Sequence, residues 1–158
     1  MAMNIVLVEP EIPQNTGNIV RTCAGTGTNL HMIKPLGFSV EDRYLKRAGL
    51  DYWHLVNIRY YENYEEFYKT AISENPEAKF FMCTTKTKKS HTDVKFSDGD
   101  YIVLGKETKG LPLPLIEANP DTSIRIPMKK DFRCLNLSNA AAIILYEAMR
   151  QLGFPEMD

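Results

Sequence analysis

The side chains most capable of chemistry lie in three polar segments rich in glycine or proline, residues 9–21, 105–112 and 126–139. Each segment directly follows a short apolar run that reads as a β-strand. Ligands of open α/β sheets bind in the crevice beyond the carboxyl ends of the strands. The position of the three segments therefore makes them candidates for a ligand site.

The first segment reads EPEIPQNTGNIVR. Its two prolines favour an extended loop, and Asn15 or Thr16 can cap the helix that follows. Arg21 then lies about one and a half turns inside that helix. Two interpretations stay open: Asn15 as a simple cap with a solvated Arg21, or both residues as parts of a site. The segment has no Gly-x-Gly-x-x-Gly turn of a dinucleotide site.

The second segment reads GKETKGLP. Its two glycines invite comparison with a phosphate-binding P-loop. That motif needs Lys and Ser or Thr after the second glycine, whereas Leu111 and Pro112 follow here. What remains is a loop whose backbone can approach a ligand closely at Gly105, with Glu107 as its only acid. A plain glycine-rich turn is the alternative.

The third segment reads IPMKKDFRCLNLSN and is longer than most connections between a strand and a helix. Its apolar residues suggest a folded-back stretch that forms a pocket wall. They are Met128, Phe132, Leu135 and Leu137. Cys134 is interpreted as a buried structural thiol, because no histidine in the three segments could activate it.

Cysteine and histidine usage favours a reducing compartment without a metal site. The three cysteines, at positions 23, 83 and 134, are isolated and odd in number, which argues against a disulfide framework. The three histidines have no spacing typical of metal ligands. We therefore expect a cytoplasmic protein with no bound metal.

Charge is balanced overall but clustered along the chain. Nineteen basic against twenty acidic residues argue against a protein that coats nucleic acid indiscriminately. Residues 86–95 and 125–133 each carry four cations and one acid, and Arg43, Lys46 and Arg47 form a third group. Such runs are usually solvated faces. Two of them flank the candidate segments, however, which favours a polyanionic substrate.

The apolar pattern predicts an α/β fold with a mostly parallel sheet covered by helices on both faces. The expected strands are residues 5–8, 30–33, 55–60, 80–84, 101–104 and 123–126. Helices are expected at residues 39–49, 63–75, with Asn63 as N-cap, and 112–118. No linker or repeat interrupts the pattern, so we expect a single domain over residues 1–158. The N-terminus reads as a first strand and not as a signal peptide, and no apolar stretch approaches the ~20 residues of a membrane span.

The last expected helix begins near Ser138 or Asn139 and ends at Gly153. Residues 140–146 are all apolar, so the first two turns have no polar face and need cover on two sides. One cover is the sheet. A second subunit is the favoured candidate for the other, since twofold dimers are the commonest oligomers. The chain's own loops are the alternative.

Taken in order, the three segments resemble the motifs of the SPOUT class of S-adenosylmethionine-dependent RNA 2′-O-methyltransferases, in particular its small TrmL-type (YibK-like) tRNA members. The connecting stretch RAGLDY at 47–52 also fits, so the resemblance extends from residue 4 to residue 154. It implies a SPOUT-like fold with a deep C-terminal trefoil knot, in a homodimer joined through the C-terminal helix. It further implies a cytoplasmic enzyme that methylates the wobble nucleotide, cytidine or modified uridine 34, in the tRNA anticodon stem-loop.

The same resemblance implies the roles of individual residues. Those matching the catalytic set are Asn15, Arg21, Glu107 and Asn136. Those matching the S-adenosyl-L-methionine site, where backbone groups hold the cofactor, are Cys83, Thr84, Gly105, Glu107, Ile126, Pro127, Met128, Cys134 and Leu135. Arg21 takes the place of the general base, but a guanidinium is effectively always protonated. We expect Arg21, from its own or the opposite subunit, to orient the 2′-oxygen or a phosphate and to stabilise developing negative charge.

Two alternatives remain open. A SPOUT enzyme that acts on another ribose, in tRNA or ribosomal RNA, would share every motif. A non-enzymatic α/β RNA-binding or receiver-like module would need no loop as long as residues 127–138. Many relatives have Ser at the position of Cys134. A cysteine would weaken a serine-type hydrogen bond to the substrate or cofactor, so Cys134 receives no catalytic role.

Overall fold

A parallel sheet forms the centre of the molecule. The computed structural model describes residues 1–39, 41, 43, 45, 47 and 52–158, and within them the sheet has six strands in the order β3-β2-β1-β5-β4-β6, every adjacent pair parallel. The strands are β1 (Asn4–Val8), β2 (Asn29–Ile33), β3 (Ile58–Tyr61), β4 (Phe80–Cys83), β5 (Tyr101–Leu104) and β6 (Ser123–Ile124). The predicted parallel sheet is confirmed.

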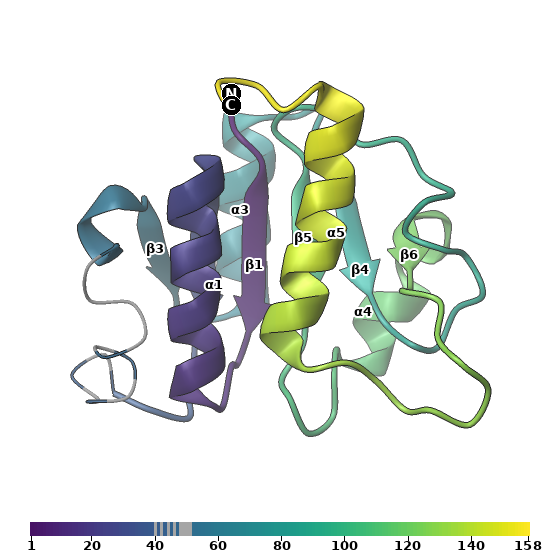
Figure 1. The fold of residues 1–158 in the computed structure, drawn as a ribbon. Helices are drawn as coiled ribbons and strands as arrows, with labels where there is room; N and C mark the ends of the chain where they lie inside the picture. Colours follow the sequence, from purple (N-terminus) through teal and green to yellow (C-terminus); the bar gives the residue numbers. More distant parts are fainter. Residues whose placement is uncertain (40, 42, 44, 46, 48–51) are drawn as a thin grey trace.

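Helices cover both faces of this sheet, as predicted. They are α1 (Pro13–Thr26), α3 (Tyr64–Glu74), α4 (Leu113–Glu117) and α5 (Leu137–Leu152). Helices α1 and α5 lie side by side on one face, and α3 and α4 lie on the other (Figure 1). Side chains alternate along β1: Ile5 and Leu7 pack toward α1 and α5, whereas Val6 and Val8 pack toward α3 and α4. The helix expected at residues 39–49 lies largely outside the described residues.

The predicted third strand, residues 55–60, is wrong at its start. Trp53–Leu55 forms a 3₁₀ helix, and β3 begins only at Ile58. Leu55 is 63% exposed. A short apolar run does not by itself distinguish a strand from a turn with an exposed apolar residue.

Helix α3 has the N-cap that its sequence predicts, and α5 has the predicted C-terminal end. The Asn63 Oδ1 accepts a hydrogen bond from the Glu66 backbone N at 2.8 Å and so caps α3. Helix α5 begins slightly earlier than expected, because Asn136 is its N-cap and accepts from the Ser138 backbone N at 2.9 Å. Its end is the left-handed Gly153, at φ +81°.

The start of α1 differs from the prediction. The helix begins at Pro13 with Ile12 at the N-cap position, so neither Asn15 nor Thr16 is the cap. Proline suits the first helical position because its missing N–H has no partner to lose there. The Asn15 side chain is thereby left free for contacts outside the helix.

The strand order reverses between β1 and β5. From β1 the chain adds β2 and then β3 on one side, whereas β5, β4 and β6 lie on the other side. The loops after β1 and β5 therefore leave the sheet next to each other at the point where the order reverses. This is where open α/β sheets bind ligands.

Helix α5 is only partly covered within the chain. The sheet and α1 bury Ala141, Ile144 and Leu145, but Ile143 stays 40% exposed and Tyr146 45% exposed. No loop among the described residues covers these two side chains. The described helices include none with the length and apolarity needed to cross a bilayer.

A buried polar network extends from Asn4 at the start of β1, through His31 in the middle of β2, to Tyr61 at the end of β3. His31 is 3% exposed; its Nε2 donates to the Asn4 Oδ1 at 3.0 Å, and its Nδ1 accepts from the Tyr61 hydroxyl at 2.9 Å. This tautomer follows because the Asn4 amide nitrogen donates to the Gly99 carbonyl, which leaves its oxygen as acceptor. Burial lowers the pKa of His31 to about 4.

We expect this histidine to make the folded state less stable as the pH falls. Because its folded-state pKa lies below the unfolded value of about 6.5, the unfolded chain binds the proton first, and up to about 3 kcal/mol of stability is lost between about pH 6.5 and pH 4. Urea denaturation at several pH values across this interval measures the loss. The His31→Gln variant should show a shallower pH dependence, and His54→Gln, which changes an exposed histidine, should keep the wild-type slope. Equal slopes for wild type and His31→Gln would contradict the assignment.

Candidate functional site

The carboxylate of Glu107 joins the loops that follow β1 and β5. Its Oε1 accepts from the Glu11 backbone N at 2.9 Å, and its Oε2 accepts from the Ile12 backbone N at 2.8 Å and from the Asn15 Nδ2 at 3.1 Å. These donors lie at the start of α1, whose own first turn contains no acidic residue. Glu107 therefore supplies the negative charge that a helix N-terminus favours.

Asn136 adds the third segment to this network. Its Nδ2 donates to the Asn15 Oδ1 at 3.0 Å, while its Oδ1 caps α5. Asn15 thus bridges Glu107 and Asn136. Three of the four residues that match the catalytic set form one continuous hydrogen-bonded chain across three segments that are distant in sequence.

A second set of contacts ties the same two loops in the reverse direction. The Glu11 Oε1 accepts from the backbone N of Thr108 at 3.0 Å and from its hydroxyl at 2.8 Å. These two hydrogen bonds lower the pKa of Glu11. Lys106 Nζ lies 3.3 Å from Glu9 Oε1. Each loop therefore places a carboxylate on the backbone of the other.

Gly105 is required for the closure of its own loop. Its position is buried, and a Cβ placed there would overlap the backbone of Gly110 and Leu111. The loop closes through the Gly110 backbone N, which donates to the Lys106 carbonyl at 2.8 Å, and Gly110 has a φ of +69°. The expected close approach at Gly105 is thus an approach of the chain to itself, beside the candidate ligand site.

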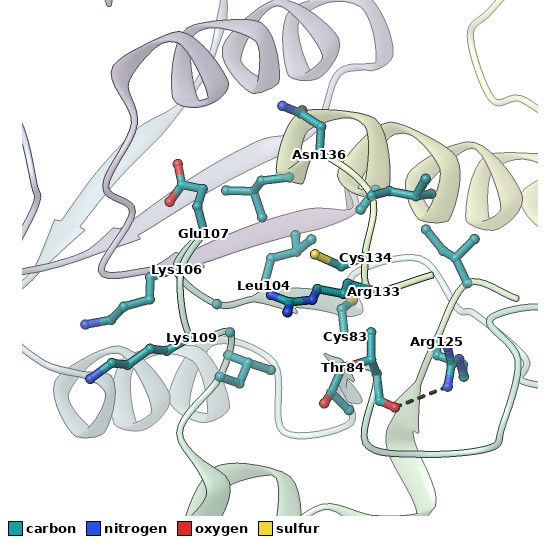
Figure 2. Close-up of a pocket in the computed structure, with 18 of the residues that line it drawn as sticks. Cys83, Thr84, Leu104, Lys106, Glu107, Lys109, Arg125, Arg133, Cys134 and Asn136 are labelled. Atoms are coloured by element: carbon teal, nitrogen blue, oxygen red, sulfur yellow. Dashed lines mark hydrogen bonds between the residues drawn. The ribbon is translucent and has the colours of Figure 1, made fainter. Parts of the chain in front are cut away.

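A cavity of about 630 Å³ opens between the three loops (Figure 2). It is lined by most residues that match the cofactor site: Cys83, Thr84, Gly105, Glu107, Ile126, Met128, Cys134 and Leu135. Asn15 and Asn136 also line it. The volume is within the range of about 300–1,000 Å³ that is typical of small-molecule sites.

Two residues predicted at this wall do not line the cavity. Pro127 is exposed, whereas its neighbours Ile126 and Met128 line the cavity. Adjacent residues of an extended segment point to opposite sides, which explains the difference. Phe132 is also absent from the lining and is 62% exposed.

Cations surround the cavity. Lys106 and Lys109 come from the loop after β5, and Arg125 lies across from them (Figure 2). Lys86 and Arg133 also line it. Lys86, Arg125 and Arg133 belong to the basic runs of the sequence. Lys106 and Lys109 lie outside these runs, and only their position just after a predicted strand could have indicated them.

Arg21 lies outside the cavity of its own chain. It follows Asn15 by six residues, which places it about 9 Å further along α1 and about 240° around it. Its exposed guanidinium lies 5.2 Å from the centroid of the Tyr52 ring. Within a single chain, the fourth residue of the matched catalytic set is therefore separate from the other three.

Cys23 and Cys83 offer no activated thiol. All three are free, and burial raises the pKa of Cys23 to about 12 and also raises the pKa of Cys83. The prediction of a buried Cys134 is wrong: the residue is exposed, because the loop after β6 extends along the cavity and not through the core. Among the described residues, no three His, Cys, Asp or Glu side chains gather as a metal site.

The parallel α/β fold of this chain matches solved structures of RNA methyltransferases. A solved structure described as "Structural insights into the 2-OH methylation of C/U34 on tRNA" matches with a TM-score of 0.90 and 39% identity, over 96% of this chain and 97% of that chain. An AdoMet-bound rRNA methyltransferase from Sinorhizobium meliloti, at 23% identity and a TM-score of 0.83, has the same fold over 96% of this chain and 57% of its own.

Sequence comparison defines the family. Residues 2–146 match the SpoU rRNA Methylase family, and the chain belongs to this family. It is 49% identical over 154 residues to the tRNA (cytidine(34)-2′-O)-methyltransferase of Escherichia coli K12, which covers 97% of this chain and 96% of that protein. It is 48% identical to the protein of the same name from Yersinia pestis, over 97% and 96% of the two chains.

A methyl group at Gly105 should damage the site, whereas one at Gly25 should not. Gly105→Ala should destabilise the protein by about 1–3 kcal/mol through overpacking and should weaken binding of S-adenosylmethionine. The Gly25 position in α1 has no atom within 4 Å of an added Cβ, so Gly25→Ala should stabilise the protein by about 0.5–1 kcal/mol. Chemical denaturation and titration calorimetry measure both effects. Wild-type stability and affinity in Gly105→Ala would disprove the proposed loop closure.

Proposed function

We propose that this protein transfers a methyl group from S-adenosylmethionine to the ribose 2′-hydroxyl of the wobble nucleotide, position 34, in tRNA. The observation that carries the proposal is the Glu107–Asn15–Asn136 network at the wall of a ligand-sized cavity, in a chain 49% identical to an enzyme named for this reaction. The similarity extends over nearly the whole length of both proteins, which favours a shared substrate over another RNA ribose.

The cavity residues fit S-adenosylmethionine. Leu104, Ile126 and Leu135 provide an apolar wall for the adenine, and Lys86 and Arg125 provide positive charge for the carboxylate of the methionine part. The shared fold with an AdoMet-bound methyltransferase supports this assignment. When bound, the cofactor supplies an electrophilic methyl group on its sulfonium.

Three residues of the proposed catalytic set act by positioning. The Glu107 carboxylate already accepts three hydrogen bonds, so it is poorly placed to take a proton from the ribose. Both ends of the Asn15 amide are engaged, and so are both ends of the Asn136 amide. Together they fix the three loops, so that the ribose hydroxyl and the methyl group can be held at reacting distance.

Arg21 acts in the cavity of a second subunit. Its exposed position on α1 is turned away from its own cavity, and the adjacent helix α5 has exposed Ile143 and Tyr146. A homodimer packed through α5 would cover these two side chains and place Arg21 near the partner cavity. There the guanidinium orients the 2′-oxygen or a neighbouring phosphate and stabilises the developing negative charge.

The trefoil knot and the cytoplasmic location are parts of the same proposal. Gln151 of α5 accepts from the Phe96 backbone N at 2.8 Å and donates to the Val94 carbonyl at 3.0 Å, so the connection between β4 and β5 is tied to α5. Ser90 of the same connection pairs with Arg125 after β6. These contacts bring together the segments that the proposed knot involves. Three free cysteines and a tRNA substrate support a reducing cytoplasm.

Methylation of nucleotide 34 can be measured directly. The purified protein should methylate unmodified tRNA in the presence of S-adenosylmethionine, and mass spectrometry of nuclease fragments should locate the new methyl group on the ribose of nucleotide 34. A tRNA with a 2′-deoxy nucleotide 34 should accept none. Methylation of another tRNA or ribosomal RNA ribose would overturn the position, and RNA binding without methyl transfer to any RNA would favour a non-enzymatic module.

Arg21→Ala should lower kcat by about 10²–10³-fold, the usual cost of removing one group that stabilises developing negative charge. Affinity for S-adenosylmethionine and the dimer should be unchanged, since Arg21 is assigned to the ribose oxygen or a phosphate and is not among the residues that line the cofactor cavity. Single-turnover methylation, calorimetry and sedimentation measure the three properties. Lys69→Ala, which removes an exposed cation on α3, is the control and should retain full activity.

Mixed dimers test whether Arg21 acts across subunits. Arg21→Ala subunits keep an intact cavity, and Gly105→Ala subunits keep Arg21, so each inactive variant supplies what the other lacks. Random exchange in an equal mixture should restore about one quarter of the wild-type activity, because half of the dimers have one complete site. A mixture as inactive as its components would show that Arg21 acts within its own chain.

A further inference from the structure

Phe132 is the apolar residue of the loop after β6 whose side chain the cavity does not use. Met128 and Leu135 of the same loop line the cavity, as does Leu137 at the start of α5, whereas Phe132 is 62% exposed. The Phe132 backbone N donates to the Lys129 carbonyl at 3.2 Å. This contact closes a tight turn that holds the aromatic ring at the tip of the loop.

The backbone of the turn passes through the left-handed region. Asp131, directly before Phe132, has a φ of +70°, a conformation that Asp adopts more readily than most residues other than glycine. Arg133 and Met128, on either side of the turn, both line the cavity. The tip that carries Phe132 therefore lies next to the cavity and is anchored to it at both ends.

Positive charge surrounds the exposed ring. Lys129, Lys130 and Arg133 are exposed, and no ion pair joins them to an acid within the described residues. The only acid in the turn is Asp131. A single exposed apolar residue is ordinary by itself, but an aromatic ring among unpaired cations is the combination that binds single-stranded nucleic acid.

We propose that Phe132 stacks on a nucleobase next to the methylated nucleotide, while Lys129, Lys130 and Arg133 contact the neighbouring phosphates. This inference rests on the proposed function, because it takes the RNA segment to enter the cavity beside the turn. An unpaired anticodon-loop base has the exposed face that stacking needs. A second copy of the chain is a poorer occupant, since a twofold contact through this turn would bring two sets of cations together.

The test uses an anticodon stem-loop RNA with 2-aminopurine beside nucleotide 34, because stacking quenches the fluorescence of this base. The wild-type protein should quench it on binding. Phe132→Ala should lose the quenching and bind the RNA roughly 5- to 150-fold more weakly, the range for loss of one stacked base. Phe132→Trp should restore both properties, and affinity for S-adenosylmethionine should be equal in all variants.

Phe154→Ala is the matched control, because Phe154 is 42% exposed and lies beyond the distant end of α5. It should quench and bind like the wild type. Wild-type RNA affinity and quenching in Phe132→Ala would overturn the inference while leaving nucleotide 34 methylation intact. Loss of the dimer in Phe132→Ala, seen by sedimentation, would assign the ring to a subunit interface and would also overturn it. Failure of the wild-type protein to methylate any tRNA would reject the proposed function itself.

Discussion

The hydrogen bonds that the Glu107 carboxylate accepts at the start of α1 are the contact on which the site depends. Two of its donors are backbone amides, Glu11 N and Ile12 N, and the third is the Asn15 amide. Hydrogen bonds to a charged group are roughly twice as strong as those between neutral groups. The carboxylate also lies where the helix dipole favours negative charge. One side chain therefore fixes the direction of α1 and the shape of the loop after β5.

The topology of the sheet makes this contact possible. Because β1 and β5 are adjacent but 92 residues separate Asn15 from Glu107, the two loops meet only after the parallel sheet has formed. Gly105 then permits the tight closure that turns Glu107 toward α1. Asn136, another 29 residues along the chain from Glu107, adds the start of α5 through Asn15. The cavity is thus a consequence of long-range packing.

These distances explain which features the sequence could predict. Strand β5 and the cap of α3 follow from local signals, an apolar run and Asn63, and both were predicted. The start of α1 was not predicted, because Asn15, a residue type that favours the N-cap position, instead contacts Glu107 and Asn136, which are 92 and 121 positions further along the chain. The exposure of Cys134 and Phe132 also escaped prediction, since a loop residue's surroundings depend on the path of the whole loop. The resemblance pointed to Glu107 and Asn136, and the structure places both in one hydrogen-bonded network through Asn15; their catalytic roles stay a prediction.

One group of residues fixes the shape of the site, and a different group is available to bind an anion. Asn15, Glu107 and Asn136 form hydrogen bonds with one another and with the backbone, and these hydrogen bonds hold the loops in place. The exposed cations Lys129, Lys130 and Arg133 make no ion pair within the described part of the chain, so they remain available to phosphates. With a net charge of only −1, the protein attracts RNA through this clustered charge and not through its overall charge. Binding then depends on salt through these few contacts, and an exposed aromatic ring among them adds an apolar contribution that salt does not screen.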